Sequence, residues 1–234
     1  MHTLTTEQTC SYRQNGYLIV SKSLDPIPIE SFREEFQSHH TQQSTKRGAS
    51  IYGVRNIPED FDTVRTLAHS AQYALWLKQL LIADAFPTRG LYFDKLDGAN
   101  WHLTWHQDLA IAVKKKFDTE GYHGWSMKEG VTHVIPHLPI MENRIAMRFH
   151  LYDCGIENFG LNILSGSHRH GKLSRQDLTQ WTEDHTAVSY TRNKGDILIM
   201  HPLVLHASSP AISPTHRRVI HIEYATLPLD GNLE

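Results

Sequence analysis

Features that would direct a chain out of the cell or into a membrane are scarce in these 234 residues. The two cysteines, Cys10 and Cys154, lie far apart, which argues against a disulfide framework and favours a reducing compartment. No apolar run approaches the ~18 residues of a membrane-spanning helix, and the polar first residues lack the apolar core of a secretion signal. A net charge of −2 gives no basis for a nucleic-acid or membrane-surface partner. We therefore expect a cytoplasmic protein that acts on a small molecule.

Internal repeats, low-complexity segments and Pro/Ser-rich linkers are also absent, which favours a single domain over residues 1–234. Helical signals dominate the first third. Thr5 or Thr6 can cap a helix that ends at Gly16 before a strand over 17–20, a second helix is expected near 29–40, and apolar residues at three- and four-residue steps predict a helix over 61–84. From residue 88 strand-like segments follow one another, over 90–93, 103–113, 145–152, 161–164, 187–190, 196–200, 204–206 and 218–225. This order predicts a β-rich α+β fold with the helices packed on one side.

Residues 114–136 show no clear hydrophobic period. Loops of this length are usually functional or disordered. We expect this segment to close over a substrate as a lid.

Histidine, by contrast, is abundant, with 17 residues. His106 and Asp108 lie two positions apart, so in the predicted strand 103–113 their side chains would share one face. An imidazole and a carboxylate suit Fe(II), and a distant histidine, His206, would complete the 2-His-1-carboxylate set of non-haem Fe(II) oxygenases. The metal centre itself is then the catalytic group, and no separate acid or base is assigned.

The His-x-Asp pattern alone is weak, because about one such triplet is expected by chance in a chain of this composition. His221-Ile222-Glu223 is a competing site. Two downstream residues favour the first site. Arg217 stands eleven residues after His206 and can bind a dicarboxylate through a bidentate fork, with the Ser208 hydroxyl as a second contact.

Strand alternation distinguishes Arg217 from its neighbour Arg218. Arg217 shares a mostly polar face with His221 and Glu223, whereas Arg218 shares a mostly apolar one. Arg217 is therefore expected in the pocket, with His221 and Glu223 as pocket residues rather than a second metal site. The other candidate contacts to substrate or cosubstrate are Arg148 and His150, for which an ion-paired arginine and a structural histidine are the alternative, and Lys95 and Arg55.

Four stretches of the chain together resemble the phytanoyl-CoA dioxygenase family of Fe(II)/2-oxoglutarate oxygenases, in particular its bacterial members. They are LTTEQTCSYRQNGYLIV, WHQD, LNILSGSHRHG and KGDILIMHPLVLHASSPAISPTHRR. The resemblance implies a double-stranded β-helix, the cupin-like jelly roll, flanked by helices. It also implies iron ligands at His106, Asp108 and His206, a 2-oxoglutarate clamp at Arg217 and Ser208, and O2 as the oxidant.

The carboxylate at Asp108 separates this chain from related halogenases, in which Gly or Ala replaces it to open a halide site. The expected activity is hydroxylation of a small polar metabolite with release of succinate and CO2. The alternative is a non-oxygenase on the same scaffold, a cupin-like metal-dependent isomerase or a ligand-binding module, because a fold does not determine function.

Overall fold

The computed structural model describes residues 1–24, 30–32, 34–36, 44–47, 50–95, 102–117, 119–128, 130–153, 161–191, 193–210 and 217–229, without the side chains of 44–47, 50–52, 95 and 217. No helix in these ranges is both long and apolar enough to span a membrane.

The first helix and strand follow directly from local sequence. Thr5 caps α1 (Thr6–Asn15) through a capping box with Gln8, and Gly16 ends the helix at φ 81°. A left-handed residue at this position is the usual role of glycine. Strand β1 (Tyr17–Val20) follows at once, as predicted.

The helix predicted over 61–84 is wrong as a single element. The chain forms α3 (Ile57–Asp60), α4 (Asp62–Ala68) and α5 (Ala71–Leu81), with an extended Ser70 preceding α5. The buried side chains of α5 are Tyr73, Trp76, Leu77 and Leu80. The two aromatic side chains therefore lie on the covered face of α5, whereas Ala71 and Ala74 are exposed. Of the helix predicted near 29–40, residues 30–32 and 34–36 are described and are helical.

The strands in the described ranges form three sheets, and every pairing among them is antiparallel. The seven-stranded sheet has the order β1, β12 (Ile197–Met200), β9 (Arg144–His150), β14 (Arg217–Ala225), β4 (Phe86–Lys95), β3 (Ser50–Arg55) and β2 (Ser44–Arg47). The four-stranded sheet has the order β11 (Val188–Ser189), β10 (Asn162–Leu164), β13 (Leu205–Ser208) and β5 (Leu103–His106). The three-stranded sheet has the order β6 (Ile111–Val113), β8 (Val131–Ile135) and β7 (His123–Lys128).

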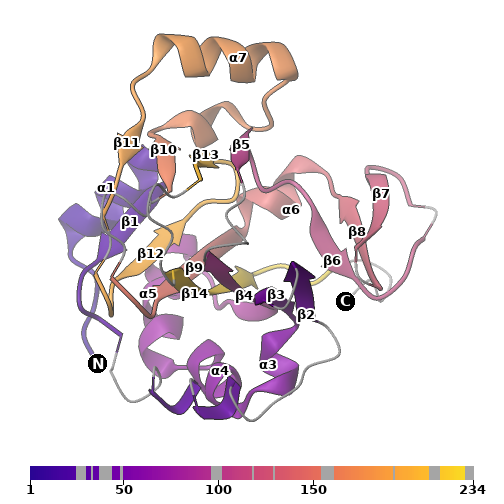
Figure 1. Cartoon of the computed structure of the whole chain (residues 1–234). Coiled ribbons are helices and arrows are strands. Elements are labelled where there is room, and N and C mark those ends of the chain that lie inside the picture. The colour runs from indigo at the N-terminus through magenta and orange to yellow at the C-terminus, as the bar shows by residue number, and fades with distance from the viewer. Residues whose placement is uncertain are drawn as a thin grey trace.

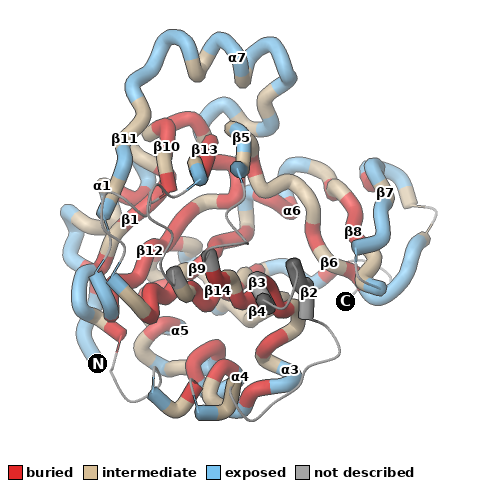
Figure 2. Tube along the Cα trace, in the orientation of Figure 1, coloured by how far each residue is buried: buried red, intermediate tan, exposed pale blue. Residues whose placement is uncertain are grey.

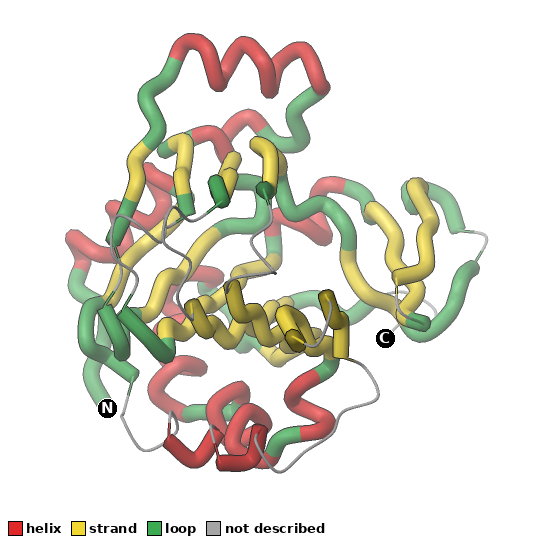
Figure 3. Tube along the Cα trace, in the orientation of Figure 1, coloured by secondary structure: helices red, strands yellow, loops and turns green. Residues whose placement is uncertain are grey.

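The seven-stranded sheet is covered on its two faces by different layers. Helices α3, α4 and α5 lie on one side of it and the four-stranded sheet lies on the other (Figure 1; Figure 3). The main core fills the helix side, where Ile220, Ile222 and Tyr224 of β14 pack against the α4 and α5 side chains. A smaller cluster, including Ile163 and Leu198, joins the two sheets. The buried trace therefore runs through the middle of the molecule, while α7 (Arg175–Asp184) has no buried residue (Figure 2).

Two predictions for the middle of the chain need correction. The strand predicted over 103–113 is two strands, β5 and β6, because residues 107–110 between them are not in a strand. Residues 114–136, predicted to lack regular structure, contain β7 and all of β8, with Gly130 at φ 79° between them. Five of the six β7 residues are exposed, so this hairpin carries none of the hydrophobic alternation by which a half-buried strand is recognised. The short helix α6 (Leu138–Glu142) and the 3-10 turn Ser167–His170 complete the described elements.

Candidate metal centre and cavity

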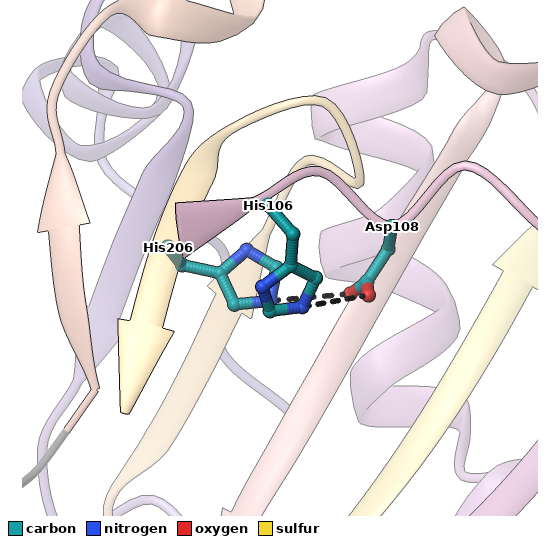
Figure 4. Close-up of side chains that lie close together, drawn as sticks. All are labelled: His106, Asp108 and His206. Carbon is teal, nitrogen blue, oxygen red and sulfur yellow. Dashed lines mark ion pairs between the residues drawn. The ribbon is translucent and has the colours of Figure 1, made fainter. Parts of the chain in front are cut away.

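Three side chains predicted to bind a metal converge between the sheets. His106 ends β5 and His206 lies beside it on β13, where the two are direct cross-strand partners. The Asp108 carboxylate reaches the same point from the loop after β5, so the predicted placement of Asp108 within a strand is wrong although its convergence is correct (Figure 4). The Asp108 N–H donates to the Pro202 carbonyl at 2.8 Å, which holds the loop next to β13.

The spacing of the three side chains fits a shared cation better than direct hydrogen bonds. Nε2 of His106 lies 3.6 Å from one Asp108 oxygen, and Nε2 of His206 lies 3.5 Å from the other. Both separations exceed ordinary hydrogen-bond lengths. The three donor atoms lie within 4.8 Å of one another, and no other such group of histidine, cysteine or acidic residues occurs in the described ranges.

Backbone contacts orient both imidazoles with Nε2 toward this point. Nδ1 of His106 lies 2.8 Å from the Thr104 carbonyl, and Nδ1 of His206 lies 3.0 Å from the Val204 carbonyl. Because a carbonyl only accepts, each Nδ1 carries the proton of the neutral ring and each Nε2 presents a lone pair. Such a bond from the second nitrogen is the usual device for orienting a metal-bound histidine.

Burial and charge act on this group in opposite directions. Burial would raise the pKa of Asp108, but the nearby His206 and His106 rings hold it below its ordinary range. Burial lowers the pKa of His206 to about 4. Burial would also lower the pKa of His106, but the nearby Asp108 carboxylate raises it overall. A carboxylate beside a neutral buried imidazole is a suitable donor set for a divalent cation.

Gln107 lies between His106 and Asp108 in the chain. The residue is 8% exposed, and its side chain makes three hydrogen bonds to backbone groups. Nε2 donates to the carbonyls of Gly171 and Leu203, at 2.8 and 2.7 Å, and Oε1 accepts from the Leu173 N–H at 2.9 Å. Gln107 therefore ties the metal loop to two neighbouring segments, a role that its spacing in the sequence does not reveal.

A cavity of about 310 Å³ opens beside the three residues and is floored by β4, β9 and β14. His221 and Glu223 of β14 line it, as strand alternation predicted, and Arg148 and Arg55 line it too. His150 is buried but is not among the described residues that line this cavity. The cavity is also lined by Arg89, Lys128, His133 and Arg144.

The expected 2-oxoglutarate contacts are described only in part. Arg217 begins β14 opposite Lys95 of β4, and both side chains lie outside the described part of the structure. Arg218 lies on the helix side of the sheet, where it donates to Asp94 at 3.0 Å and to the Tyr152 hydroxyl at 2.9 Å. Ser208 is buried on β13, two residues after His206.

Comparison with known protein families identifies the family to which the chain belongs. The family model described as phytanoyl-CoA dioxygenase (PhyH) matches residues 12–219. The chain belongs to the phytanoyl-CoA dioxygenase family. The matched region of this family includes the three converging residues and Arg217. A curated relative, the peroxisomal phytanoyl-CoA dioxygenase of Bos taurus, is 24% identical over 238 residues, which cover 95% of this chain and 68% of the relative.

Solved structures show the same fold at low sequence identity. EctD from S. alaskensis, solved with 2-oxoglutarate and 5-hydroxyectoine, superposes with a TM-score of 0.73 at 16% identity, covering 95% of this chain and 76% of EctD. The 2-oxoglutarate-dependent epimerase SnoN from nogalamycin biosynthesis gives 0.69 at 16%, covering 94% and 79%. The carbocyclase SnoK from the same biosynthesis gives 0.69 at 15%, covering 98% and 95%.

These likenesses confirm the predicted fold, a jelly-roll double-stranded β-helix flanked by helices. Family membership and the fold together support the class of iron- and 2-oxoglutarate-dependent oxygenases. Because the similar structures include an epimerase and a carbocyclase, the class by itself does not specify hydroxylation.

Proposed function

We propose that this member of the phytanoyl-CoA dioxygenase family is an Fe(II)/2-oxoglutarate-dependent dioxygenase that hydroxylates a small polar metabolite. The observation that carries the proposal is the convergence of two oriented Nε2 lone pairs and one carboxylate. Three donors on one side of an ion leave its remaining positions for cosubstrate and oxygen, the arrangement of non-haem Fe(II) oxygenases. The donor set therefore fits Fe(II), and His106, Asp108 and His206 would hold it.

Bound iron and 2-oxoglutarate would supply the activation of O2 and the oxidation of a substrate carbon, with succinate and CO2 released. The chain itself supplies orientation. The Thr104 and Val204 carbonyls hold the two imidazoles, and Gln107 and Pro202 hold the loop that carries Asp108. His206 is buried, whereas His106 and Asp108 are partly exposed toward the cavity from which cosubstrate and substrate would reach the ion.

Arg217 is our candidate for the far carboxylate of 2-oxoglutarate, with Ser208 beside it. The register of β14 is regular from Arg217 to Glu223, so position 217 has the same alternation as the cavity-lining His221 and Glu223. The next residue, Arg218, donates hydrogen bonds to Asp94 and to the Tyr152 hydroxyl on the other face of the strand. An arginine suits this task because its guanidinium binds a carboxylate through two parallel hydrogen bonds.

The direct test is reconstitution of metal-free protein with Fe(II) under nitrogen, followed by 2-oxoglutarate and then O2. We expect stoichiometric Fe(II) binding, 2-oxoglutarate binding that depends on the metal, and succinate formation on exposure to oxygen. Asp108→Ala should lose metal binding and succinate formation. Asp84→Ala, which removes an exposed carboxylate paired with Lys78, is the matched control and should retain both.

The outcomes separate the competing functions. Metal binding without 2-oxoglutarate binding or oxygen consumption would refute the oxygenase and favour a metal-dependent isomerase or ligand-binding module. Succinate formation with a product that has gained no oxygen atom would retain the oxygenase class and refute hydroxylation. Mass spectrometry of products formed under ¹⁸O2 distinguishes these cases.

A further inference from the structure

A second group of charged side chains gathers in the cavity around Glu223, six residues along β14 from Arg217. At about 3.3 Å per strand residue, the two positions are about 20 Å apart. Glu223 is the cross-strand partner of Arg89 on β4, and it also lies close to Arg144 at the start of β9. The Arg89 guanidinium lies 3.4 Å from one Glu223 oxygen, and the Arg144 guanidinium lies 3.9 Å from the other.

These side chains are removed from solvent, with 9% of Arg89 and 5% of Arg144 exposed. Nε of Arg89 is buried and has no hydrogen-bond partner among the described residues. In the described part of the structure, both guanidinium groups face the same carboxylate, that of Glu223. The buried Nε–H of Arg89 has no acceptor there, and a bound anion would accept its hydrogen bond.

His133 of β8 reaches the same cavity from the three-stranded sheet. It is 1% exposed, and its Nδ1 lies 2.9 Å from the Val131 carbonyl, so Nδ1 carries the proton and Nε2 is an acceptor. Nε2 has no partner among the described residues. Burial, followed by the charge of Arg89, lowers the pKa of His133, which keeps the ring neutral. The histidine therefore offers a lone pair, next to Arg89, to a ligand group that donates a hydrogen bond.

The charge of the described lining residues favours a further anion beyond the cosubstrate. Among these residues are five cationic side chains, those of Arg55, Arg89, Lys128, Arg144 and Arg148, and two carboxylates, those of Asp108 and Glu223. Iron(II) and dianionic 2-oxoglutarate carry equal and opposite charge, so their binding leaves this excess unchanged. A volume of about 310 Å³ is at the lower end of the range for small-molecule sites.

We propose that Arg89, Arg144 and His133, with Lys128 at the rim, form an anion-binding subsite for the primary substrate. The substrate class is a small organic anion whose carboxylate or phosphate binds the two arginines and whose neighbouring hydroxyl or N–H donates to His133. Glu223 holds both guanidinium groups in place rather than contacting the ligand anion. The identity of this anion as the molecule that is oxidised rests on the proposed function, whereas its binding does not.

The experiment titrates inorganic phosphate and malonate, separately, into anaerobic Fe(II) protein saturated with 2-oxoglutarate, with heat or ligand-observed NMR as the readout. We expect saturable binding of at least one probe, and the probe that binds more tightly identifies the phosphate or the carboxylate source. Arg89→Gln and Arg144→Gln should each weaken this binding about tenfold or more, the loss of a hydrogen bond to a charged group. Their affinity for 2-oxoglutarate should stay at the wild-type value.

Two further variants keep the test independent of folding. Lys128 is exposed, so the Lys128→Gln protein should fold normally and still bind the probe more weakly than wild type. Arg65→Gln removes an exposed arginine paired with Asp62 outside the cavity and should leave probe binding unchanged. Circular dichroism and thermal unfolding verify that each variant is folded.

The inference is overturned if neither probe binds in the presence of saturating 2-oxoglutarate, or if the Lys128 and Arg65 variants bind the probe with the same affinity. It is also overturned if Arg89→Gln weakens the binding of 2-oxoglutarate. In the last case the arginine pair would be the cosubstrate clamp. A protein that binds no Fe(II) or 2-oxoglutarate but still binds a probe through these residues would refute the proposed function and retain the subsite.

Discussion

Gln107→Leu is the most informative single change at the candidate metal centre, because leucine preserves the approximate volume and removes only the polar contacts. The substitution leaves the Gly171 carbonyl, the Leu203 carbonyl and the Leu173 N–H without their side-chain partner. A buried backbone group without a partner costs about 1–3 kcal/mol. Leu203 is buried whereas Gly171 and Leu173 are partly exposed, so water can replace some of these bonds. We expect the free energy of unfolding to fall by about 3 kcal/mol.

The same change should weaken metal binding, since Gln107 lies between two candidate ligands and anchors the loop of Asp108. Removal of the residues that orient metal ligands typically costs about 10- to 100-fold in metal affinity. Urea denaturation of the metal-free protein measures the stability, and anaerobic Fe(II) titration measures the affinity.

The matched control is Gln180→Leu, which removes an exposed glutamine bonded to Asp184 on α7 and should change neither quantity. A Gln107→Leu protein within about 0.5 kcal/mol of wild type, the usual range for surface changes, and with unaltered Fe(II) affinity would refute this reasoning.

Three further outcomes follow from the structure. Arg217→Ala should weaken the binding of 2-oxoglutarate at least about tenfold, because a charge-assisted pair is lost. Arg218→Ala should lower stability and leave the affinity for 2-oxoglutarate nearly unchanged. Equal affinities of the two variants in titration would reject Arg217 as the clamp. If residues 114–136 act as a lid, metal and cosubstrate should slow their limited proteolysis, and identical cleavage rates would contradict this. Burial lowers the pKa of His201 from 6.5 to about 4, so the unfolded chain binds the extra proton between these values and stability falls as the pH drops through this window. At pH 5 the loss is roughly 2 kcal/mol, measured as the difference between wild type and His201→Gln in urea unfolding; the exposed His185→Gln should keep the wild-type slope.

The parts of the structure that could be predicted from the sequence are those with local causes. Thr5 and Gly16 define α1 because a capping box and a left-handed glycine each act within one helical turn. The two faces of β14 were predicted correctly because the strand is regular from Arg217 to Glu223, so alternation holds along it. The three residues predicted as metal ligands converge, although Asp108 reaches the other two from a loop that alternation does not govern.

The subsite around Glu223 could not be predicted in the same way, since it depends on cross-strand register. Arg89 and Glu223 are 134 residues apart and become partners only because β4 pairs with β14 at that register. A slip of one residue in that pairing would turn Arg89 to the helix side. The hairpin that brings His133 into the cavity gave no hydrophobic signal because β7 is exposed.

Composition hides the charge of the cavity for a related reason. The chain as a whole has a net charge of −2, yet the described residues that line its cavity include more cations than carboxylates. The net charge of the sequence therefore gives no indication of the charge among these lining residues. An anion that binds the buried Arg89 and Arg144 would stabilise the folded protein by mass action. Because the charge of 2-oxoglutarate is balanced by that of the iron it accompanies, we propose that this anion is the substrate.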